Sequence, residues 1–214
     1  MNDIEGVGFI LPHWFYWGWL LVMPTLFLLW AKTSKVMPAV EYAEGAGPVE
    51  KFLDWISDRS GWFVSLWSVN AVAAYTYEVV ARYLFDTPTI WVHESSFLLF
   101  GMQYMLAGAY GMLHGSHVRV DVLYSKLSAR GQAAMDVFTS VFFFIFIVAM
   151  VATSYTFFVD SVAIDERSLE TWQVQFWPVK GAMLLGAILI LLAGISRLIK
   201  DIRAFEGHLK GGAV

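Results

Sequence analysis

The chain has 214 residues, of which 58% are hydrophobic and 15% charged, with a net charge of −4 and no cysteine. Soluble domains are about 45–50% apolar and about 25% charged, so the composition excludes an ordinary soluble domain. The lack of cysteine excludes disulfides and thiolate metal sites. Several clustered apolar stretches of about 20 residues can each cross a hydrocarbon core of ~30 Å. An all-α, polytopic membrane protein is predicted, because a β-barrel would show short alternating segments.

A first apolar segment covers about residues 9–31 and is rich in tryptophan. Acidic residues, Asp3 and Glu5, precede it, whereas a signal peptide begins with positive charge. We therefore interpret this segment as a retained transmembrane helix. The polar connection after it includes residues 49–57, whose apolar side chains recur at helical spacing. This pattern predicts a short amphipathic helix that lies on the membrane surface.

Two further apolar segments, at about residues 61–85 and 91–113, predict a membrane hairpin closed by a short turn with Pro88. In the first of them, Glu78 and Arg82 lie four residues apart, so they can form an ion pair on one helix face. Ionisable groups inside a span are costly and mark candidate functional sites. A structural pair is the favoured interpretation, because Arg82 near the helix end can reach the interface.

The second arm of this hairpin opens with Trp91 and Glu94. Trp91 suits an interfacial anchor, and a carboxylate at Glu94 complements the positive end of the helix dipole. Pairing of Glu94 with Arg82 across the hairpin is an alternative that would staple the two helices. Asn70 and Gln103 are further intramembrane polar residues, and Gln103 is expected to find a polar partner.

Small residues recur along one face of the third span. At 3.6 residues per turn this face is about 100° wide, and small residues let helix backbones approach closely. Packing within the chain is the favoured interpretation, and the alternative is that this face docks another membrane protein. The residues of the face are Glu94, Phe97, Gly101, Tyr104, Gly108, Gly111 and Gly115.

After the third span, residues 118–130 predict an amphipathic arm helix that is too short to cross the membrane and lies on its surface. A fourth span at about 133–159, an acidic loop at 160–176 and a fifth span at about 177–199 follow. Pro178 suits the first turn of the last helix, where a missing N–H costs nothing. The polar residues assigned to the membrane-surface arm are His117, Arg119, Asp121, Lys126 and Arg130.

The distribution of positive charge predicts the orientation. With the N-terminus outside, only Arg82, Arg167 and Lys180 of the 14 Lys and Arg residues fall on the outer side. Because cytoplasmic segments carry the excess of Lys and Arg, five spans with a periplasmic N-terminus and a cytoplasmic C-terminus are predicted. The lipid bilayer is the expected surrounding, and no nucleic-acid partner is expected.

No phosphate-binding glycine loop, HExxH helix, nucleophile elbow or catalytic carboxylate pair is found, so we predict no catalytic residue, metal site or cofactor. The alternative is a membrane anchor of a redox complex, such as a b-type cytochrome. That class needs axial histidines at matching depth on facing helices. The candidates for such ligands lie near span ends: His13, His93, His114 and His117.

Three short motifs stand in a characteristic order: RYLF at 82–85 with Pro88, Trp91 and Glu94 after it, then GSHVRVD at 115–121, then WPVK at 177–180. This order resembles the small membrane subunit (DctQ type) of tripartite ATP-independent periplasmic (TRAP) transporters. The resemblance covers roughly residues 50–203. One departure is His93, which stands where many members of that family carry a second carboxylate beside Glu94.

The resemblance implies a four-helix DctQ-like core at 49–205, with an additional N-terminal helix and linker at 1–48 and a short tail at 206–214. It implies a DctM-type large membrane subunit that carries substrate with sodium. It also implies a DctP-type periplasmic substrate-binding protein that delivers organic acids. The small subunit would be a non-enzymatic scaffold in the bacterial inner membrane. In agreement, the sequence shows neither the inverted repeats nor the broken helix pairs common in carriers.

Overall fold

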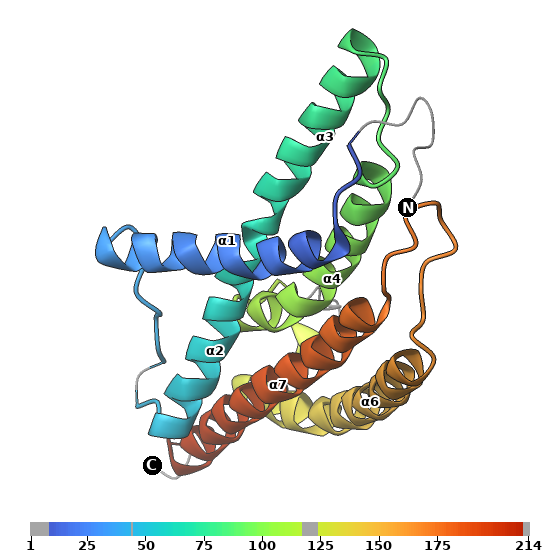
Figure 1. Ribbon diagram of the computed structural model, residues 1–214. Helices are drawn as coiled ribbons and strands as arrows, with labels where there is room; N and C mark the ends of the chain where they lie inside the picture. The colour runs from blue at the N-terminus through green and yellow to red at the C-terminus, as the bar shows by residue number, and fades with distance from the viewer. Residues whose placement is uncertain (1–8, 44, 117–123, 212–214) are drawn as a thin grey trace.

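The computed structural model describes residues 9–43, 45–116 and 124–211, and helices make up most of these ranges (Figure 1). Apart from an isolated bridge between Arg167 and Gln175, no strand pairing occurs in the described ranges. The predicted all-α fold is therefore confirmed. The described helices are α1 (His13–Thr33), α2 (Pro48–Ser65), α3 (Trp67–Leu84), α4 (Val92–Leu113), α6 (Ala129–Ala163) and α7 (Trp177–Gly211).

Helices α2, α4, α6 and α7 form the packed bundle, and α7 contacts each of the other three. The contact between α4 and α7 is close because glycines lie there. A Cβ atom placed on Gly186 would lie 2.6 Å from the carbonyl oxygen of Met105, and one on Gly108 would lie 2.6 Å from Cδ1 of Ile190. Small residues permit such close approach of membrane helices, and a larger residue at Gly186 would push the backbones apart.

Helix α1 lies across the junction of α2 and α3 (Figure 1), where a buried proline creates a specific contact. Pro24 has no amide hydrogen, so the carbonyl of Leu20, four residues earlier, loses its helical donor. The indole Nε1 of Trp67 donates to this carbonyl at 2.8 Å. Leu20, Pro24 and Trp67 are all buried. The additional N-terminal helix is thus attached to the start of α3 at the point where the hydrogen-bond pattern of α1 is interrupted.

The predicted second span and the surface helix before it are arranged differently in the structure. Helix α2 begins at Pro48, and only Leu66 separates it from α3. The prediction of a surface helix at 49–57 is wrong, because this segment is the first half of α2 and packs into the bundle. Its acidic residues Glu50 and Asp54 are 1% and 2% exposed, whereas Phe52 is 59% exposed. The acidic residues therefore point into the bundle together with Leu53, while Phe52 on the predicted apolar face points outward.

The later helices are longer than predicted. Helix α6 begins at Ala129, because the Ser128 side chain accepts a hydrogen bond from the amide of Gly131 and caps the helix. The prediction of an arm helix that continues to residue 130 is therefore wrong, while its residues 118–123 lie outside the described residues. Helix α7 continues to Gly211, well beyond the predicted end near residue 199.

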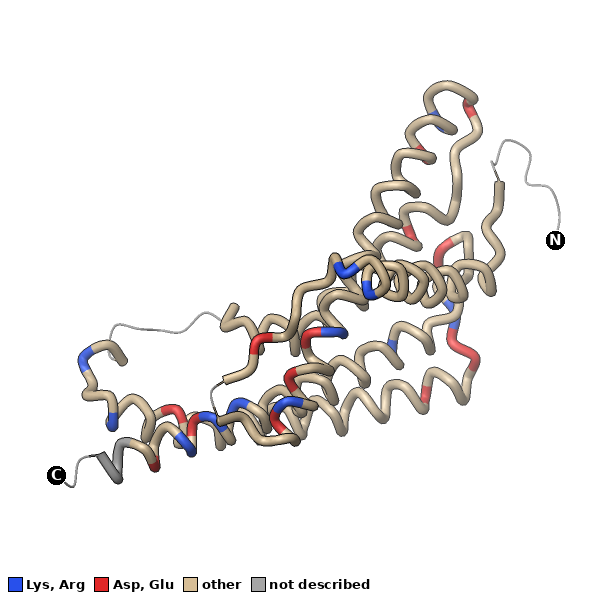
Figure 2. Tube along the Cα trace, turned by 90° about the vertical axis from the view of Figure 1, so that its left-hand side faces the viewer, with Lys and Arg blue, Asp and Glu red and all other residues tan. Residues whose placement is uncertain are grey.

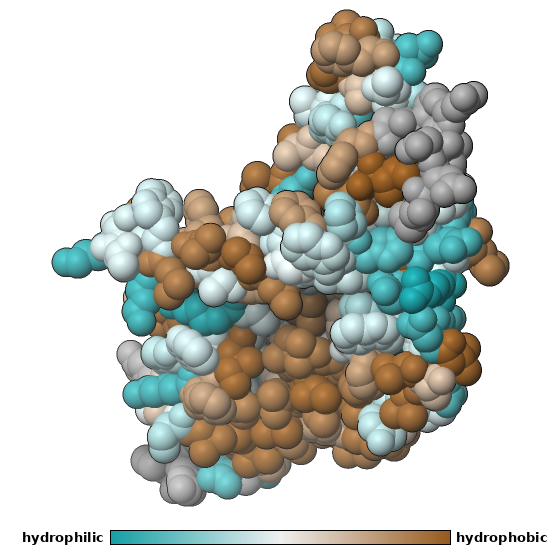
Figure 3. Space-filling view, in the orientation of Figure 1, coloured by the Kyte–Doolittle hydropathy of each residue, from teal (hydrophilic) through white to brown (hydrophobic). Residues whose placement is uncertain are grey.

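By length and composition, four of the described helices can cross a membrane: α1, α4, α6 and α7. The remaining predicted crossing corresponds to α2 and α3 together, which follow one another almost without interruption. Large apolar side chains are exposed on the long helices. Figure 3 shows a broad apolar surface below α1 with polar side chains at both edges. Such a continuous apolar surface suits lipid or a membrane partner, so the polytopic membrane fold is confirmed.

Candidate functional site

One end of the bundle, which we call the aromatic end, is built around Glu94 by four rings: His13, Tyr16, Trp91 and Trp172. The rings of Tyr16 and Trp172 lie 5.2 Å apart, and those of Trp91 and Trp172 lie 6.5 Å apart. Helix α1 supplies two of the rings, the start of α4 supplies Trp91, and the loop before α7 supplies Trp172. Parts of the chain that are distant in sequence therefore meet here.

Uncharged side-chain donors of the aromatic end form hydrogen bonds to backbone carbonyls of neighbouring segments. The indole Nε1 of Trp91 donates to the carbonyl of Phe9 at 2.7 Å, and that of Trp172 donates to Leu11 at 2.9 Å. The hydroxyl of Tyr16 donates to the carbonyl of Ser95 at 2.6 Å. The residues before and within the first turn of α1 are thus tied to both α4 and the 164–176 loop. Trp91, predicted to be an interfacial anchor, is 8% exposed.

Glu94 is 7% exposed, and neither of its carboxylate oxygens has a hydrogen bond of good geometry in the part of the chain that the structure describes. The Ser168 hydroxyl and the Trp172 amide approach the carboxylate as weak donors, and Glu170 adds a second acidic group nearby. A buried carboxylate with only weak donors is costly to ionise. Unlike Glu78, which pairs with Arg82, Glu94 therefore has no cationic side chain of Lys or Arg bound to it among the described residues.

The hairpin between α3 and α4 is closed by Glu78, not by Glu94. Arg82 Nε donates to Oε1 of Glu78 at 2.8 Å, so the predicted ion pair on α3 is confirmed. The other carboxylate oxygen accepts from the amide of Thr89 at 2.9 Å and from its hydroxyl. The alternative pairing of Arg82 with Glu94 is not formed. Glu78 is 8% exposed and staples the turn to the helix before it.

The other intramembrane polar residues have partners on neighbouring helices. Trp19 Nε1 on α1 donates to Oδ1 of Asn70 at 2.9 Å. Gln103 Nε2 on α4 donates to the hydroxyl of Ser68 on α3 at 3.0 Å, which confirms that Gln103 finds a polar partner. Each bond joins two neighbouring helices and satisfies one polar atom of the side chain, whereas Asn70 Nδ2 and Gln103 Oε1 are buried without a partner among the described residues.

The small-residue face of α4 divides into three parts. Gly108 packs against α7, as favoured for packing within the chain. Gly111 meets only Ser116, and Gly115 has φ +68° in the turn that ends α4, where glycine is favoured. Gly101 is different, because a Cβ atom there would meet nothing within 4 Å. The flanking Phe97 and Tyr104 are 74% and 75% exposed.

The opposite end of the bundle, which we call the ionic end, joins α2 to α7. Arg203 Nη2 lies 2.6 Å from Oε2 of Glu50, and Lys200 Nζ lies 2.9 Å from Oδ2 of Asp54. Asp54 also accepts from the hydroxyl of Ser196 at 2.6 Å. Sequence reasoning missed this cluster. The signal was present, since the acids of α2 and the cations of α7 both recur at helical spacing.

The ionic end extends to α4 through a histidine. His114 Nε2 lies 3.5 Å from Oδ1 of Asp58, which is 6% exposed. Figure 2 shows Lys and Arg residues gathered toward this end of the bundle, and acidic residues along the loop at the other end. The bundle is therefore electrically asymmetric along its length.

The loop at 164–176 folds back on itself beside the aromatic end. The amide of Ser168 donates to the carbonyl of Val174 at 2.9 Å, and that of Phe176 donates to Glu166 at 2.9 Å. The Glu166 side chain forms an ion pair with Lys180 in the first turn of α7. The hydrogen bond from Lys180 holds the pKa of the Glu166 carboxyl below its usual value. The loop is thereby fixed to the helix that follows it.

The residues assigned to the membrane-surface arm are only partly described. His117, Arg119 and Asp121 lie outside the described residues. Lys126 is exposed in a turn, and Arg130 is exposed in the first turn of α6. A surface role for these two cations stays a prediction.

Comparison with known proteins bears on the core of this arrangement. The family model of tripartite ATP-independent periplasmic transporters, DctQ component, matches residues 71–204, more than half of the chain. The chain belongs to the DctQ family. The match begins within α3 and ends within α7, so helix α1, the whole of α2 and the first turn of α3 lie outside it. No curated protein matches the chain in sequence.

Proposed function

We propose that this DctQ-family chain is the small scaffold subunit of a sodium-coupled transporter that imports organic acids. Its proposed partners are a DctM-type large membrane subunit and a DctP-type periplasmic substrate-binding protein. The observation that carries the proposal is the family match over residues 71–204, which includes the hairpin with Arg82, Trp91 and Glu94. In this proposal the chain is not an enzyme and requires no cofactor.

The form of the helices supports a scaffold in preference to a self-sufficient carrier. Transport sites are commonly built from pairs of discontinuous helices in related repeats. In the described ranges the bundle helices α4, α6 and α7 are continuous, and the interruption at Leu66 has no counterpart in a second repeat. Substrate and sodium would therefore bind the large subunit, while this chain holds the fixed part of that subunit in the membrane.

The bacterial inner membrane is the proposed location, with the aromatic end toward the periplasm and the ionic end toward the cytoplasm. The support is electrostatic, because Lys and Arg gather at the ionic end (Figure 2) and cytoplasmic segments carry such excess positive charge. In this orientation the 164–176 loop and the hairpin turn face the binding protein. Cysteine labelling of Leu169→Cys, an exposed position in this loop, from outside intact cells tests the orientation.

The open part of the α4 face is the proposed contact with the large subunit. Gly101 leaves a gap between the exposed rings of Phe97 and Tyr104, and such small-residue gaps let a second helix approach. Gly101→Trp should reduce the amount of large subunit that co-purifies without unfolding this chain. Gly18→Trp is the matched control, because Gly18 is equally open but lies on α1, outside the family match. Equal recovery of the large subunit with both variants would contradict this contact.

The deciding experiment is reconstitution. Proteoliposomes that hold this chain and its large subunit should take up an organic acid only with the binding protein and an inward sodium gradient. Uptake by this chain alone would contradict the scaffold role. The redox alternative gains no support from the described histidines, which have structural contacts. His13 bonds to the carbonyl of Trp172, His93 contacts the Tyr75 hydroxyl, and His114 contacts Asp58.

A further inference from the structure

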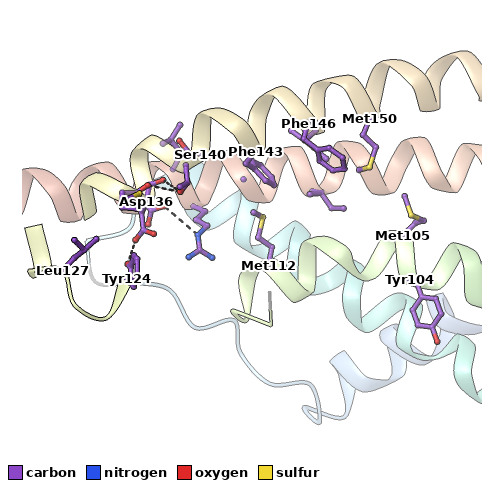
Figure 4. Close-up of a pocket in the computed structure, with 18 of the residues that line it drawn as sticks. Tyr104, Met105, Met112, Tyr124, Leu127, Asp136, Ser140, Phe143, Phe146 and Met150 are labelled. Atoms are coloured by element: carbon purple, nitrogen blue, oxygen red, sulfur yellow. Dashed lines mark hydrogen bonds and ion pairs between the residues drawn. The ribbon is translucent and has the colours of Figure 1, made fainter. Parts of the chain in front are cut away.

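A groove with a volume of about 1020 Å³ lies between α4, α6 and α7. Its lining is mostly apolar and includes methionine, phenylalanine, isoleucine and leucine side chains. Figure 4 shows Tyr124, Leu127 and Asp136 at one end, and Tyr104, Met105 and Met150 at the other. The groove is therefore polar at one end and apolar along its length.

The dimensions of the groove suit a long, thin molecule. Along α6 the lining runs from Met135 to Met150, which corresponds to about 22 Å at 1.5 Å per residue. This length exceeds the ~15 Å of hydrocarbon in one leaflet, so it can hold an acyl chain together with the polar part of a lipid at one end. The volume lies at the upper limit of ordinary small-molecule pockets, which hold about 300–1,000 Å³. An extended acyl chain fits this length, whereas a compact solute would leave most of it empty.

The lining residues also favour an acyl chain. Met105, Met112, Met135 and Met150 contribute flexible thioether side chains, which adapt to an irregular apolar partner. The groove lies between helices that can cross a membrane by length and composition, so hydrocarbon is the medium that meets its open side. A water-filled groove with these walls would be unfavourable.

The polar end supplies groups for a phosphate. Lys126 and Arg197 line the groove there, and the Tyr124 hydroxyl donates to Oδ2 of Asp136 at 2.7 Å beside them. Arg197 Nε lies 3.8 Å from Oδ2 of Asp201, and a guanidinium has five N–H donors, which one carboxylate at this distance does not exhaust. Lysine and arginine are the usual partners of phosphate groups.

We propose that this groove binds one phospholipid, with an acyl chain along α6 and α7 and the phosphate at Lys126 and Arg197. The site lies at the end of the bundle where Lys and Arg gather, which is where the headgroups of one leaflet would lie in the proposed orientation. The bound lipid would fill the gap between α4 and α6 and so act as part of the packed scaffold.

Native mass spectrometry of the full chain, purified with the proteins that accompany it, tests this proposal. The probes are phosphatidylglycerol and, without a phosphate, diacylglycerol. One phosphatidylglycerol should bind per chain, and Thr139→Trp, which fills the groove, should weaken its binding about tenfold. The matched control is Thr153→Trp. Both threonines are exposed on α6 and bond to their own helix, but Thr153 lies outside the groove.

The headgroup contact is tested separately. Lys126→Gln should weaken the binding of phosphatidylglycerol about threefold, which is the scale of an exposed charge pair. The binding of diacylglycerol should stay unchanged. Lys51→Gln, an exposed cation outside the groove, is the control. The proposal would be overturned if Lys126→Gln weakened the binding of both lipids equally, or if Thr139→Trp left the binding of phosphatidylglycerol unchanged. Photo-crosslinking from Phe146 to a protein partner instead of to lipid would overturn it as well.

Discussion

The two ends of the bundle are closed by different chemistry. At the ionic end, the buried acids Glu50 and Asp54 each face a cation on α7. At the aromatic end, indole and phenol donors bond to backbone carbonyls, and the buried acid Glu94 pairs with no Lys or Arg and has no hydrogen bond of good geometry among the described residues. Removing the charge of a buried acid should therefore lower stability at the ionic end and leave it unchanged or raise it at the aromatic end. Directional ion pairs fix which residues of α2 and α7 meet, whereas the aromatic end is held by neutral bonds.

The largest effect is expected at the ionic end. Asp54→Asn keeps the side-chain size but removes the charge that Lys200 and Ser196 contact, and breaking a buried pair commonly costs about 3–5 kcal/mol. Because Lys200 is 31% exposed, we expect about 2–3 kcal/mol, measured as lost unfolding free energy in detergent. Asp160→Asn, at an exposed position, is the control. A loss equal to that of the control would contradict the role of the pair.

The α2 helix shows what the sequence could and could not predict. The apolar spacing of residues 49–57 correctly predicts an amphipathic helix. Without knowledge of its partners, however, the same pattern predicts that the charged face is exposed. The face is buried because its cation partners lie about 140–150 residues later, as with Asp54 and Lys200. In contrast, Glu78 and Arg82 pair within one helix turn, so their ion pair was predictable. Local partners are readable from the sequence, and distant ones require the fold.

The next effect concerns the attachment of α1. Trp67→Phe keeps the ring packing but removes the donor to the Leu20 carbonyl, and an unsatisfied buried carbonyl costs about 1–3 kcal/mol. Thermal unfolding should show this loss. Pro24→Ala restores a helical amide for the same carbonyl, so Trp67→Phe should cost less in that background. Equal costs in both backgrounds would show that the indole bond does not satisfy the carbonyl.

A smaller effect is expected at the loop beside the aromatic end. The pKa of Glu166 is lower in the folded protein than in the unfolded chain. Its pairing with Lys180 therefore stabilises the fold above the ordinary glutamate pKa of about 4.3, and this contribution is lost as the pH falls through the lowered pKa. Glu166→Gln should lower stability at pH 7 by at most about 1 kcal/mol and flatten the decline of melting temperature below pH 5.

That outcome has a direct control. Glu170→Gln removes an acid from the same loop, but none of its side-chain atoms faces Lys180 in an ion pair within the described residues. Its acid-side decline should remain as in the unmodified chain. If the decline of melting temperature below pH 5 is flattened by Glu170→Gln and not by Glu166→Gln, the pH dependence comes from Glu170, which would contradict the role of the Glu166–Lys180 pair.

The aromatic end could be predicted only in part. The positions of Trp91 and Glu94 at the start of a helix were readable from the hairpin pattern. Their burial was not, because the covering residues come from both ends of the chain. Trp172 lies in a loop that the sequence marks only as acidic, and its bond to Leu11 joins residues about 160 positions apart. Indole and phenol groups in a membrane chain are ordinarily read as interfacial anchors, which hides such cross-chain bonds.

The smallest effect, and the sharpest contrast with Asp54→Asn, is expected for Glu94→Gln. The substitution replaces a buried carboxyl that has no hydrogen bond of good geometry with a neutral amide of nearly the same shape. Stability should stay within about 1 kcal/mol of the unmodified chain or rise, because the amide oxygen can keep the weak contacts with Ser168 and Trp172 and no charge remains to be desolvated. Glu78→Gln, at similar burial, should instead destabilise, since Arg82 and Thr89 contact its carboxylate. A marked loss with Glu94→Gln would contradict this expectation and would show that the charge of Glu94 stabilises the fold through Ser168, Trp172 and His13, or through a group outside this chain.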